Sequence, residues 1–367
     1  MEPPRPPPRG MGGAWLRARN AGGRGGRALL RAAGGGSGAR GGGAGAGAGT
    51  GGAGGRGGCA APPSTPSMGQ AQGSLPPSAR DSSPYVRELG LAHEAYEAAG
   101  GVRTRQHVNP LRREFQAARA APDWAEAFPE CGPGTPLTVD LGSGAGRFLL
   151  LLSHRGGGGH TALPLWAPGA RGAPCNYLGL EIRGPLAERA NGWAAFTGLA
   201  GRVRFEGAVN AAVCLGPWLR SYPGPVGLIC LQFPDPHFKA RHHKRRPWRE
   251  GEGRLVREVA EQLEPGGHVF LQSDVLDVAL DMRRAFFQGT ADLLAPAGAH
   301  GDPRAVFFHA PAKEEDEEGG RGGADGWREA GWLRENPLGT PTEREMLVQE
   351  AGDPVYRLLL EKRGNLN

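Results

Sequence analysis

The sequence predicts an α/β fold in which helices cover both faces of a mostly parallel sheet. From about Thr135 onward, short apolar runs of strand length alternate with runs whose apolar residues recur at helical spacing. Strands that alternate with helices form crossover units, which place their strands parallel in one sheet. A glycine-rich turn also joins the first predicted strand to the first predicted helix, which is a common ligand site in such folds.

Each predicted strand is rich in large apolar residues and ends at a turn. The strands are PLTVDLG (136–142), NYLGLEI (176–182), RVRFEG (202–207), GLICLQF (227–233) and HVFLQSD (268–274), with DPVYRLLLEKR (353–363) as a final candidate. The helices between them are GRFLLLLS (146–153), PLAERANGWAAF (185–196), AAVCLGPWL (211–219), GRLVREVAEQL (253–263) and VLDVALDMRRAFF (275–287).

The chain divides into a low-complexity tail and one domain. Residues 1–80 consist mainly of Gly, Ala, Pro and Arg and bury too little apolar surface to fold, so they are predicted to be disordered. Residues 81–367 form the predicted domain, with its core at about 104–363. Loop insertions are expected at about 156–176 and 289–330, and the second contains the acidic run Glu314–Glu318.

The net charge of +6 comes from the tail. The first 80 residues carry ten arginines and one acid, so the remaining chain sums to −3, and the overall balance does not by itself indicate nucleic-acid binding. An arginine-rich, acid-poor tail is typical of transit peptides and favours an organelle, with the chloroplast ahead of the mitochondrion. The nucleus and cytosol, and a tail of mere low-complexity filler, remain open. No apolar run reaches the roughly 18 residues of a membrane helix.

A glycine-rich turn follows the first strand in TVDLGSGAGRF (138–148). Gly142, Gly144 and Gly146 permit a tight turn that brings a ligand against the backbone at the start of a helix. Their G-x-G-x-G spacing differs from the G-x-G-x-x-G fingerprint of dinucleotide sites, and Asp140 would repel phosphate. Asp140 favours a cationic ligand such as S-adenosylmethionine, and a purely structural glycine turn is the alternative.

Two polar residues follow later strands at what should be the same edge of the sheet. Glu181 ends the second strand, where nucleoside-binding α/β folds place a carboxylate that accepts hydrogen bonds from ribose hydroxyls. Asn210 follows the third strand in GAVNAAV, where it either addresses an adenine edge or caps the next helix.

The fourth strand leads into FPDPHF, which places Asp235 between two prolines. Pro234 and Pro236 restrict the backbone on both sides, so the Asp235 carboxylate is predicted to be held rigidly. Rigid placement suits an active-site group, although a purely structural aspartate in a proline turn is the alternative.

A cationic run follows Asp235 directly and predicts contacts with RNA phosphates. Its members are Lys239, Arg241, Lys244, Arg245, Arg246 and Arg249. Phe238 and Trp248 are predicted to stack on bases. A merely solvated or targeting-type basic run is the alternative. The nearby histidines lack the cysteine or carboxylate spacing of a zinc site, and the five scattered cysteines form no CxxC pair, so no metal is expected.

These motifs together resemble the tRNA (guanine-N7)-methyltransferases of the bacterial TrmB type, over roughly Thr104 to Arg363. The most specific piece is FPDPHFKARHHKRR (233–246), close to the family's FPDPW-x-K-x-R-H-x-K-R-R. Further motifs in family order are RQHVNPL (105–111), VDLGSGAGRF (139–148), YLGLEI (177–182), VNA (209–211), LQSDV (271–275) and TEREMLVQEAGDPVYRLLLEK (342–362). The resemblance implies a Rossmann-like, S-adenosylmethionine-dependent methyltransferase fold with seven strands, and methylation of guanosine 46 in the tRNA variable loop at N7.

The resemblance also implies roles for individual residues. Cofactor binding falls on Asp140, Gly142, Gly144, Glu181, Ile182, Asn210 and Ala211, and the catalytic role falls on Asp235. Nucleoside and tRNA contacts fall on Lys239, Asp274, Thr342, Glu343, Arg344 and Glu345, beside the cations Arg241, Lys244, Arg245 and Arg246. The chain departs from the family pattern at His237 and Phe238, which replace a Trp-containing pair, and at Pro341, where arginine commonly stands.

The chemistry expected of such an enzyme is mainly electrostatic. Guanine N7 carries a lone pair and no proton, so methyl transfer needs no general base and yields a cationic purine. Asp235 is therefore expected to orient guanine and balance its charge. Methylation of an exocyclic amine remains open, since DPHF is similar to the D/N-P-P-Y/F motif of amino-methyltransferases, as does a non-catalytic RNA-binding scaffold. A monomer or homodimer is expected, and a non-catalytic partner subunit remains open.

Overall fold

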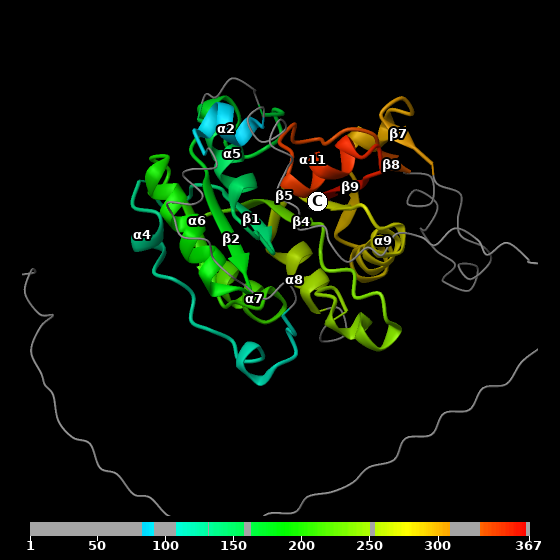
Figure 1. The fold of residues 1–367 in the computed structure, drawn as a ribbon, viewed down its shortest axis with the longest axis horizontal. Coiled ribbons are helices and arrows are strands. Elements are labelled where there is room, and N and C mark those ends of the chain that lie inside the picture. The colour runs from blue at the N-terminus through cyan, green and yellow to red at the C-terminus, as the bar shows by residue number, and fades with distance from the viewer. Residues whose placement is uncertain are drawn as a thin grey trace, which may run out of the picture. The chain divides into compact units, whose positions relative to one another are not determined.

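The computed structural model describes residues 83–91, 108–130, 132–157, 163–249, 254–308 and 331–364. Within them, a seven-stranded sheet has the order β3-β2-β1-β4-β5-β9-β6 (Figure 1). Strands β1 to β5 run parallel, and β9 pairs antiparallel with β5 and β6. This mostly parallel sheet confirms the predicted fold class. The predicted tail (1–80), residues 105–107 of the RQHVNPL motif and the run Glu314–Glu318 lie outside the described residues.

The predicted strands and helices are found close to their expected bounds. The strands of the main sheet are β1 (Leu137–Leu141), β2 (Asn176–Glu181), β3 (Val203–Gly207), β4 (Val226–Gln232), β5 (Leu263–Ser273), β6 (Leu294–Pro296) and β9 (Tyr356–Lys362). The α-helices are α2 (Pro84–Leu89), α4 (Trp124–Ala127), α5 (Arg147–Gly156), α6 (Gly184–Phe196), α7 (Ala211–Ser221), α8 (Arg254–Gln262), α9 (Leu276–Thr290) and α11 (Glu343–Glu350). Short 3-10 helices are η1 (Arg113–Phe115), η2 (Ala170–Gly172), η3 (Ala240–Arg245) and η5 (Gly298–Gly301), and β7 (Val306–Phe307) pairs with β8 (Trp332–Leu333) in a separate sheet. Among the described helices, none has the length and apolarity needed to cross a membrane.

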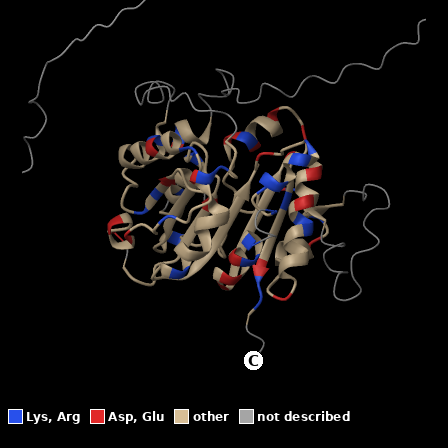
Figure 2. Cartoon of the chain, turned by 90° about the horizontal axis from the view of Figure 1, so that it is seen from below, with Lys and Arg blue, Asp and Glu red and all other residues tan. Residues whose placement is uncertain are grey.

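Helices cover both faces of the sheet because its central strands are apolar on both sides. In β4, Ile229 and Leu231 join a core with α7, α8 and α9, whereas Leu228 and Cys230 join a core with α5 and α6. Figure 2 shows charged residues mainly on the helices and connections, with the central strands largely uncharged. Polar residues on these strands are therefore informative, and they gather at one edge.

The described part of the first expected insertion consists mainly of turns and the short helix η2. Trp166 in segment 156–176 packs on His268, with ring centroids 4.4 Å apart. The expectation for 289–330 is wrong in its first part, because Leu294–Pro296 forms β6 at the edge of the main sheet. A strand of three residues is too short to show an alternating pattern in the sequence.

Candidate active site

The glycine turn after β1 packs tightly at Gly146 and faces open space at Gly142. Gly142, Gly144 and Gly146 have φ of 79°, 55° and 80°, a region that glycine enters without the strain other residues incur. A Cβ at Gly146 would lie 2.6 Å from Ala190 Cβ and 2.8 Å from the Phe205 ring, so only glycine fits there. A Cβ at Gly142 would meet nothing within 4 Å. The turn therefore packs closely against α6 and β3 and leaves room for a ligand at Gly142.

Glu181, at the end of β2, lies against this turn. Its side chain is 2% exposed, and Oε2 accepts a 2.8 Å hydrogen bond from the Gly144 N–H. Oε1 accepts bonds from the backbone N–H and Nε of Arg183, at 2.9 and 2.8 Å. Ile182 follows directly and is partly buried. The predicted cofactor residues of β1 and β2 are thus brought together.

Arg183 lies against the predicted site residues, although the sequence alone did not point to it. Burial alone would lower its pKa, but the hydrogen bond and charge of Glu181, and then the charge of Asp235, raise it above the usual value. Arg183 therefore pairs with the predicted cofactor carboxylate, and the charge of the predicted catalytic carboxylate also acts on it. Its only signal in the sequence is a basic residue after GLEI, which is common on protein surfaces.

Asp140 is a buried carboxylate, 4% exposed, near the carboxyl end of β1, which lies between β2 and β4 in the sheet. It accepts a 3.2 Å hydrogen bond from Gln232 Nε2. Burial raises the pKa of Asp140 to about 7, the Gln232 hydrogen bond opposes this shift, and the charge of Glu181 adds to it. The Ser143 hydroxyl is also buried and has no hydrogen-bond partner among the described residues. A site with two carboxylates, an orphan hydroxyl and an open glycine turn fits a cationic nucleoside cofactor.

Binding of S-adenosylmethionine is expected to tighten about tenfold as the pH rises from about 6 to about 8, because only the anionic form of Asp140 attracts a cation. The folded pKa of about 7 lies well above the usual pKa of an aspartate side chain. Asp140 therefore destabilises the ligand-free fold progressively as the pH rises from about 4 to about 7, and a bound cation offsets this cost. Calorimetry at pH 6, 7 and 8 measures the effect.

Asp140→Asn is the matched variant for this titration, because it keeps the shape and removes the ionisation. The other groups that face Asp140 are Glu181 and Cys230, and burial, then the charge of Asp140, raises the thiol pKa of Cys230 well above its usual value. The variant should bind the cofactor with little pH dependence. A dependence as steep as that of the wild type would contradict the assignment.

Asn210 and Ala211 lie at the start of α7. Asn210 is the N-cap, and its Oδ1 accepts a 3.1 Å hydrogen bond from the Ala212 N–H. The capping role that the sequence left as an alternative is therefore present. A contact between Asn210 and adenine stays a prediction.

Asp235 lies three residues beyond β4, exposed, on a turn that is strained on both sides. Phe233 and His237 have φ of 46° and 47°, values that are unusual for residues other than glycine and typical of functional sites. The Phe233 N–H donates a 2.8 Å hydrogen bond to a carbonyl of β5. The Arg246 guanidinium donates two more to the Pro236 carbonyl, at 3.1 and 2.8 Å. Arg246 therefore helps the prolines to hold the Asp235 turn.

The placement of Arg246 and Trp248 corrects the prediction of a fully exposed cationic run. Arg246 is 4% exposed and Trp248 is 1% exposed, so base stacking by Trp248 is wrong and Arg246 faces inward rather than toward phosphate. Arg246, Trp248 and Arg249 donate hydrogen bonds of 2.7, 2.8 and 2.9 Å to the carboxylate of Asp281 on α9. Burial would raise the pKa of Asp281, but the hydrogen bonds from Arg249, Arg246 and Trp248 hold it below the usual value.

Four cations of the run lie on η3 and its N-cap and are here called the cationic strip: Lys239, Arg241, Lys244 and the half-buried Arg245. Arg249 is also exposed, but it pairs with Asp281. The cationic strip is close in sequence to Asp235. Phe238 is 64% exposed beside it. In the described part of the chain, no three His, Cys, Asp or Glu side chains are grouped to hold a metal ion.

The second predicted tRNA segment forms the start of α11. Thr342 is the N-cap, with Oγ1 accepting a 3.1 Å hydrogen bond from a backbone N–H of the first turn. Arg344 pairs with Asp274, just beyond β5, and Glu343 pairs with Arg147 of α5. These ion pairs place the start of α11 at the strand edge that also carries the glycine turn.

A buried chain of polar side chains joins α11 to Asp140. Gln272 Nε2 donates to Gln232 Oε1 at 2.8 Å and to Glu345 Oε2 at 3.3 Å, and Gln232 in turn donates to Asp140. Glu345 is 1% exposed and pairs with buried Arg357 at 2.8 Å, so the predicted RNA contact of Glu345 is wrong. The two glutamines were visible in the sequence as single polar residues near the ends of apolar strands.

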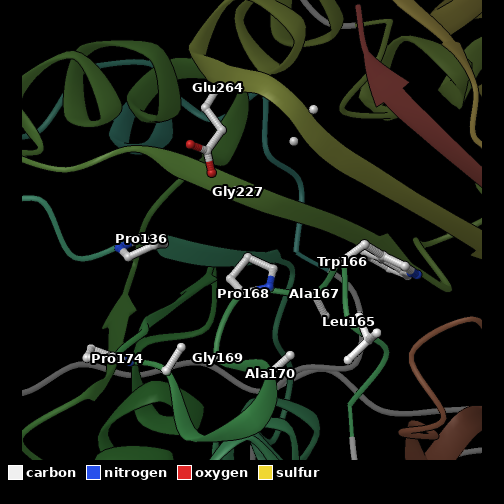
Figure 3. A pocket seen from close by; sticks show the side chains of 13 residues that line it. Pro136, Leu165, Trp166, Ala167, Pro168, Gly169, Ala170, Pro174, Gly227 and Glu264 are labelled. Carbon is white, nitrogen blue, oxygen red and sulfur yellow. The ribbon is translucent and has the colours of Figure 1, made fainter.

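The pocket in Figure 3 lies at the amino-terminal ends of the parallel strands, opposite the ends that carry the glycine turn. Trp166 and Pro168 of the first insertion line it, together with Gly227 at the start of β4 and Glu264 at the start of β5. Burial raises the pKa of Glu264. No predicted site residue lines this pocket, because they follow the carboxyl ends of the parallel strands.

The chain is similar to known methyltransferases. A family model described as "Putative methyltransferase" matches residues 166–292. The tRNA (guanine-N(7)-)-methyltransferase of Synechococcus elongatus is 39% identical over 259 residues, which cover 70% of this chain and 95% of that protein. That of Synechocystis sp. is 35% identical over 261 residues, covering 71% and 98%. A solved O-methyltransferase of Thermotoga maritima aligns with a TM-score of 0.32 at 14% identity, over 66% of this chain and 63% of that one.

The family model and the relatives make this chain a methyltransferase, and its family and fold imply the use of S-adenosylmethionine. Two cyanobacterial relatives are 39% and 35% identical to it over 95% and 98% of their own length. This chain belongs to the tRNA (guanine-N(7)-)-methyltransferase family.

Proposed function

We propose that this protein transfers a methyl group from S-adenosylmethionine to N7 of a guanosine in tRNA, giving 7-methylguanosine. The observation that carries the proposal is the position of Asp235. It is an exposed carboxylate on a braced turn three residues beyond β4, and it closely precedes the cationic strip in the sequence. We take the target to be guanosine 46 of the variable loop, which the family resemblance implies.

The cofactor is proposed to lie along the glycine turn. The residues proposed to hold it are Asp140, Gly142, Gly144, Glu181, Ile182, Asn210 and Ala211. Glu181 accepts hydrogen bonds from ribose hydroxyls, and Asp140 offsets the positive charge of the sulfonium and ammonium groups. When bound, the cofactor supplies an electrophilic methyl group.

Asp235 is proposed to act on the guanine. Its carboxylate accepts hydrogen bonds from guanine N1–H or the exocyclic amine and so orients the N7 lone pair. As N7 gains its methyl group, the purine becomes cationic, and the nearby carboxylate stabilises that charge. No residue needs to remove a proton, because guanine N7 carries a lone pair and no proton.

Neutralising the cationic strip is expected to weaken tRNA binding and to flatten its dependence on salt. Each contact between a cation and a phosphate releases counterions, and the slope of log affinity against log salt changes by roughly 0.7–0.9 per contact. The triple variant Lys239→Gln, Arg241→Gln, Lys244→Gln should therefore lower the slope by about 2 to 3. Filter binding to tRNA at several salt concentrations measures it.

The control for this variant removes three surface charges elsewhere, through Arg171→Gln, Arg220→Gln and Arg257→Gln, all exposed or partly exposed. It should leave the slope near the wild-type value, and both variants should bind S-adenosylmethionine normally. Equal losses of slope in the two triple variants would mean that the strip has no special role.

Methyl transfer to unmodified tRNA tests the proposed function. The full chain is incubated with the tRNA and labelled S-adenosylmethionine, and the product nucleosides are identified by mass spectrometry. The expected product is 7-methylguanosine. A nucleoside methylated on an exocyclic amine would support the alternative enzyme, and tRNA binding without transfer would support a non-catalytic scaffold.

The compartment and the assembly are further parts of the proposal. The arginine-rich, acid-poor composition of residues 1–80 and the cyanobacterial source of the relatives support action in the chloroplast. Residues 1–80 fused to a fluorescent protein should direct it there, and a mitochondrial or cytosolic signal would contradict this. A monomer or homodimer is proposed, which light scattering distinguishes from a larger assembly.

A further inference from the structure

Helix α2 (Pro84–Leu89) precedes the stretch that resembles the family, yet it packs into the body of the protein. Tyr85, Leu89 and Leu91 are buried together with the leucines of α5, and Figure 1 shows α2 beside α5. Ser83 caps the start of α2, and Gly90 ends it with a φ of 64°. The helix is therefore a defined element with its own start and stop signals.

The first link from α2 to the site runs through Arg155 of α5. Its guanidinium pairs with both carboxylate oxygens of Glu88, at 3.0 and 2.7 Å. The remaining nitrogen, Nη1, donates to the Gly339 carbonyl at 2.6 Å and to Thr340 Oγ1 at 3.3 Å. Arg155 and Thr340 are 7% and 0% exposed. Glu88 thus fixes a buried guanidinium whose other side holds a loop.

The second link is direct. The Tyr85 hydroxyl donates a 2.7 Å hydrogen bond to the carbonyl of Pro341, and Tyr85 is 1% exposed. Pro341 is one of the positions where this chain departs from the family pattern. Its neighbour Thr342 is the N-cap of α11.

Both links end on the loop Asn336–Pro341, immediately before the segment proposed to meet tRNA. Asn336 closes the loop from within, donating from Nδ2 to the Thr340 carbonyl at 3.1 Å and to the buried Glu345 at 2.8 Å. The position of the loop therefore sets where α11 begins and how Arg344 reaches Asp274.

We propose that Tyr85 and Glu88 are positioning residues for tRNA recognition. Helix α2 clamps the loop Asn336–Pro341 through Arg155 and Pro341, so that the start of α11 is held ready at the active-site edge. This inference rests on the proposed function. It assigns a role in substrate binding to a helix that precedes the motifs by which this chain resembles the family.

The test uses Glu88→Gln and Tyr85→Phe in the full chain. Each keeps the shape of its side chain and weakens one link. The KM for tRNA should rise about tenfold in each variant, while kcat at saturating tRNA and the affinity for S-adenosylmethionine stay within about twofold. Hydrogen exchange should become faster at residues 336–345 and stay unchanged in β1 to β4.

Arg87→Gln is the matched control, since Arg87 is an exposed residue on the same helix, and it should behave as the wild type in both measurements. Unchanged exchange at 336–345 in both test variants would overturn the proposal. So would a loss spread evenly over exchange, cofactor affinity and kcat, which indicates a general role in folding. If the wild type transfers no methyl group to tRNA, the proposed function fails separately, while the exchange data still decide whether α2 holds the loop.

Discussion

Asp235→Ala is expected to lower single-turnover methyl transfer to tRNA by about 10²- to 10³-fold, the usual effect of removing a placed electrostatic group from an active site. The carboxylate is exposed and held by a braced turn, so its loss should not unfold the protein. Affinity for S-adenosylmethionine should stay close to that of the wild type, because Asp140 and Glu181 are untouched. Rapid-quench kinetics with labelled cofactor, at saturating enzyme, measure the chemical step.

Asp235→Asn separates the two tasks assigned to this carboxylate. The amide keeps a hydrogen-bond acceptor and loses the charge, so an intermediate rate is expected if orientation and charge both contribute. A wild-type single-turnover rate in Asp235→Ala would remove Asp235 from the mechanism.

Of the proposed substitutions, Asp281→Asn should destabilise the protein most, by about 3 kcal/mol in the free energy of unfolding. The substitution leaves the buried Arg246 without its charge partner and weakens the acceptor for Trp248 and Arg249. Because Arg246 also holds the Pro236 carbonyl, the Asp235 turn should loosen, and methyl transfer should fall below what the folded fraction predicts. Urea denaturation and single-turnover kinetics give the two numbers.

Asp277→Asn is the control for this prediction, since Asp277 is an exposed residue on the same helix. The pH dependence of stability offers a second check. The pKa of Asp281 is held below its usual value, so its contribution is present above about pH 4 and is lost as the pH falls through the folded pKa. Asp281→Asn should flatten this acid limb. A variant as stable and as active as the Asp277→Asn control would show that the Asp281 hydrogen bonds do not support the site.

The sheet could be predicted because its principal strands and helices are long enough to show their periodicity. The short strands could not, since β6 spans three residues and β7 and β8 span two each. Their pairing depends on partners far along the chain, which no local pattern records.

Some residues of the candidate site could likewise be placed from the sequence, and others could not. The positions of Gly142 and Glu181 were predictable, because glycine favours tight turns and the carboxyl ends of parallel strands lie at the same side of a sheet. That of Arg246 was not, because its inward orientation depends on Asp281, 35 residues further on. Glu345 likewise turns inward because Arg357 is buried beneath it. From the sequence alone, a charged residue is predicted to be exposed, because charged residues are rarely buried without a partner and the partner is not known.

Methyl transfer to a tRNA transcript that carries 7-deazaguanosine at position 46 tests the central claim most directly. This base keeps the Watson–Crick edge of guanine, including N1–H and the exocyclic amine, and lacks only the nitrogen at position 7. The protein should methylate the matched guanosine transcript, yield 7-methylguanosine, and transfer no methyl group to the 7-deaza transcript. Equal methylation of the two transcripts would contradict N7 as the acceptor.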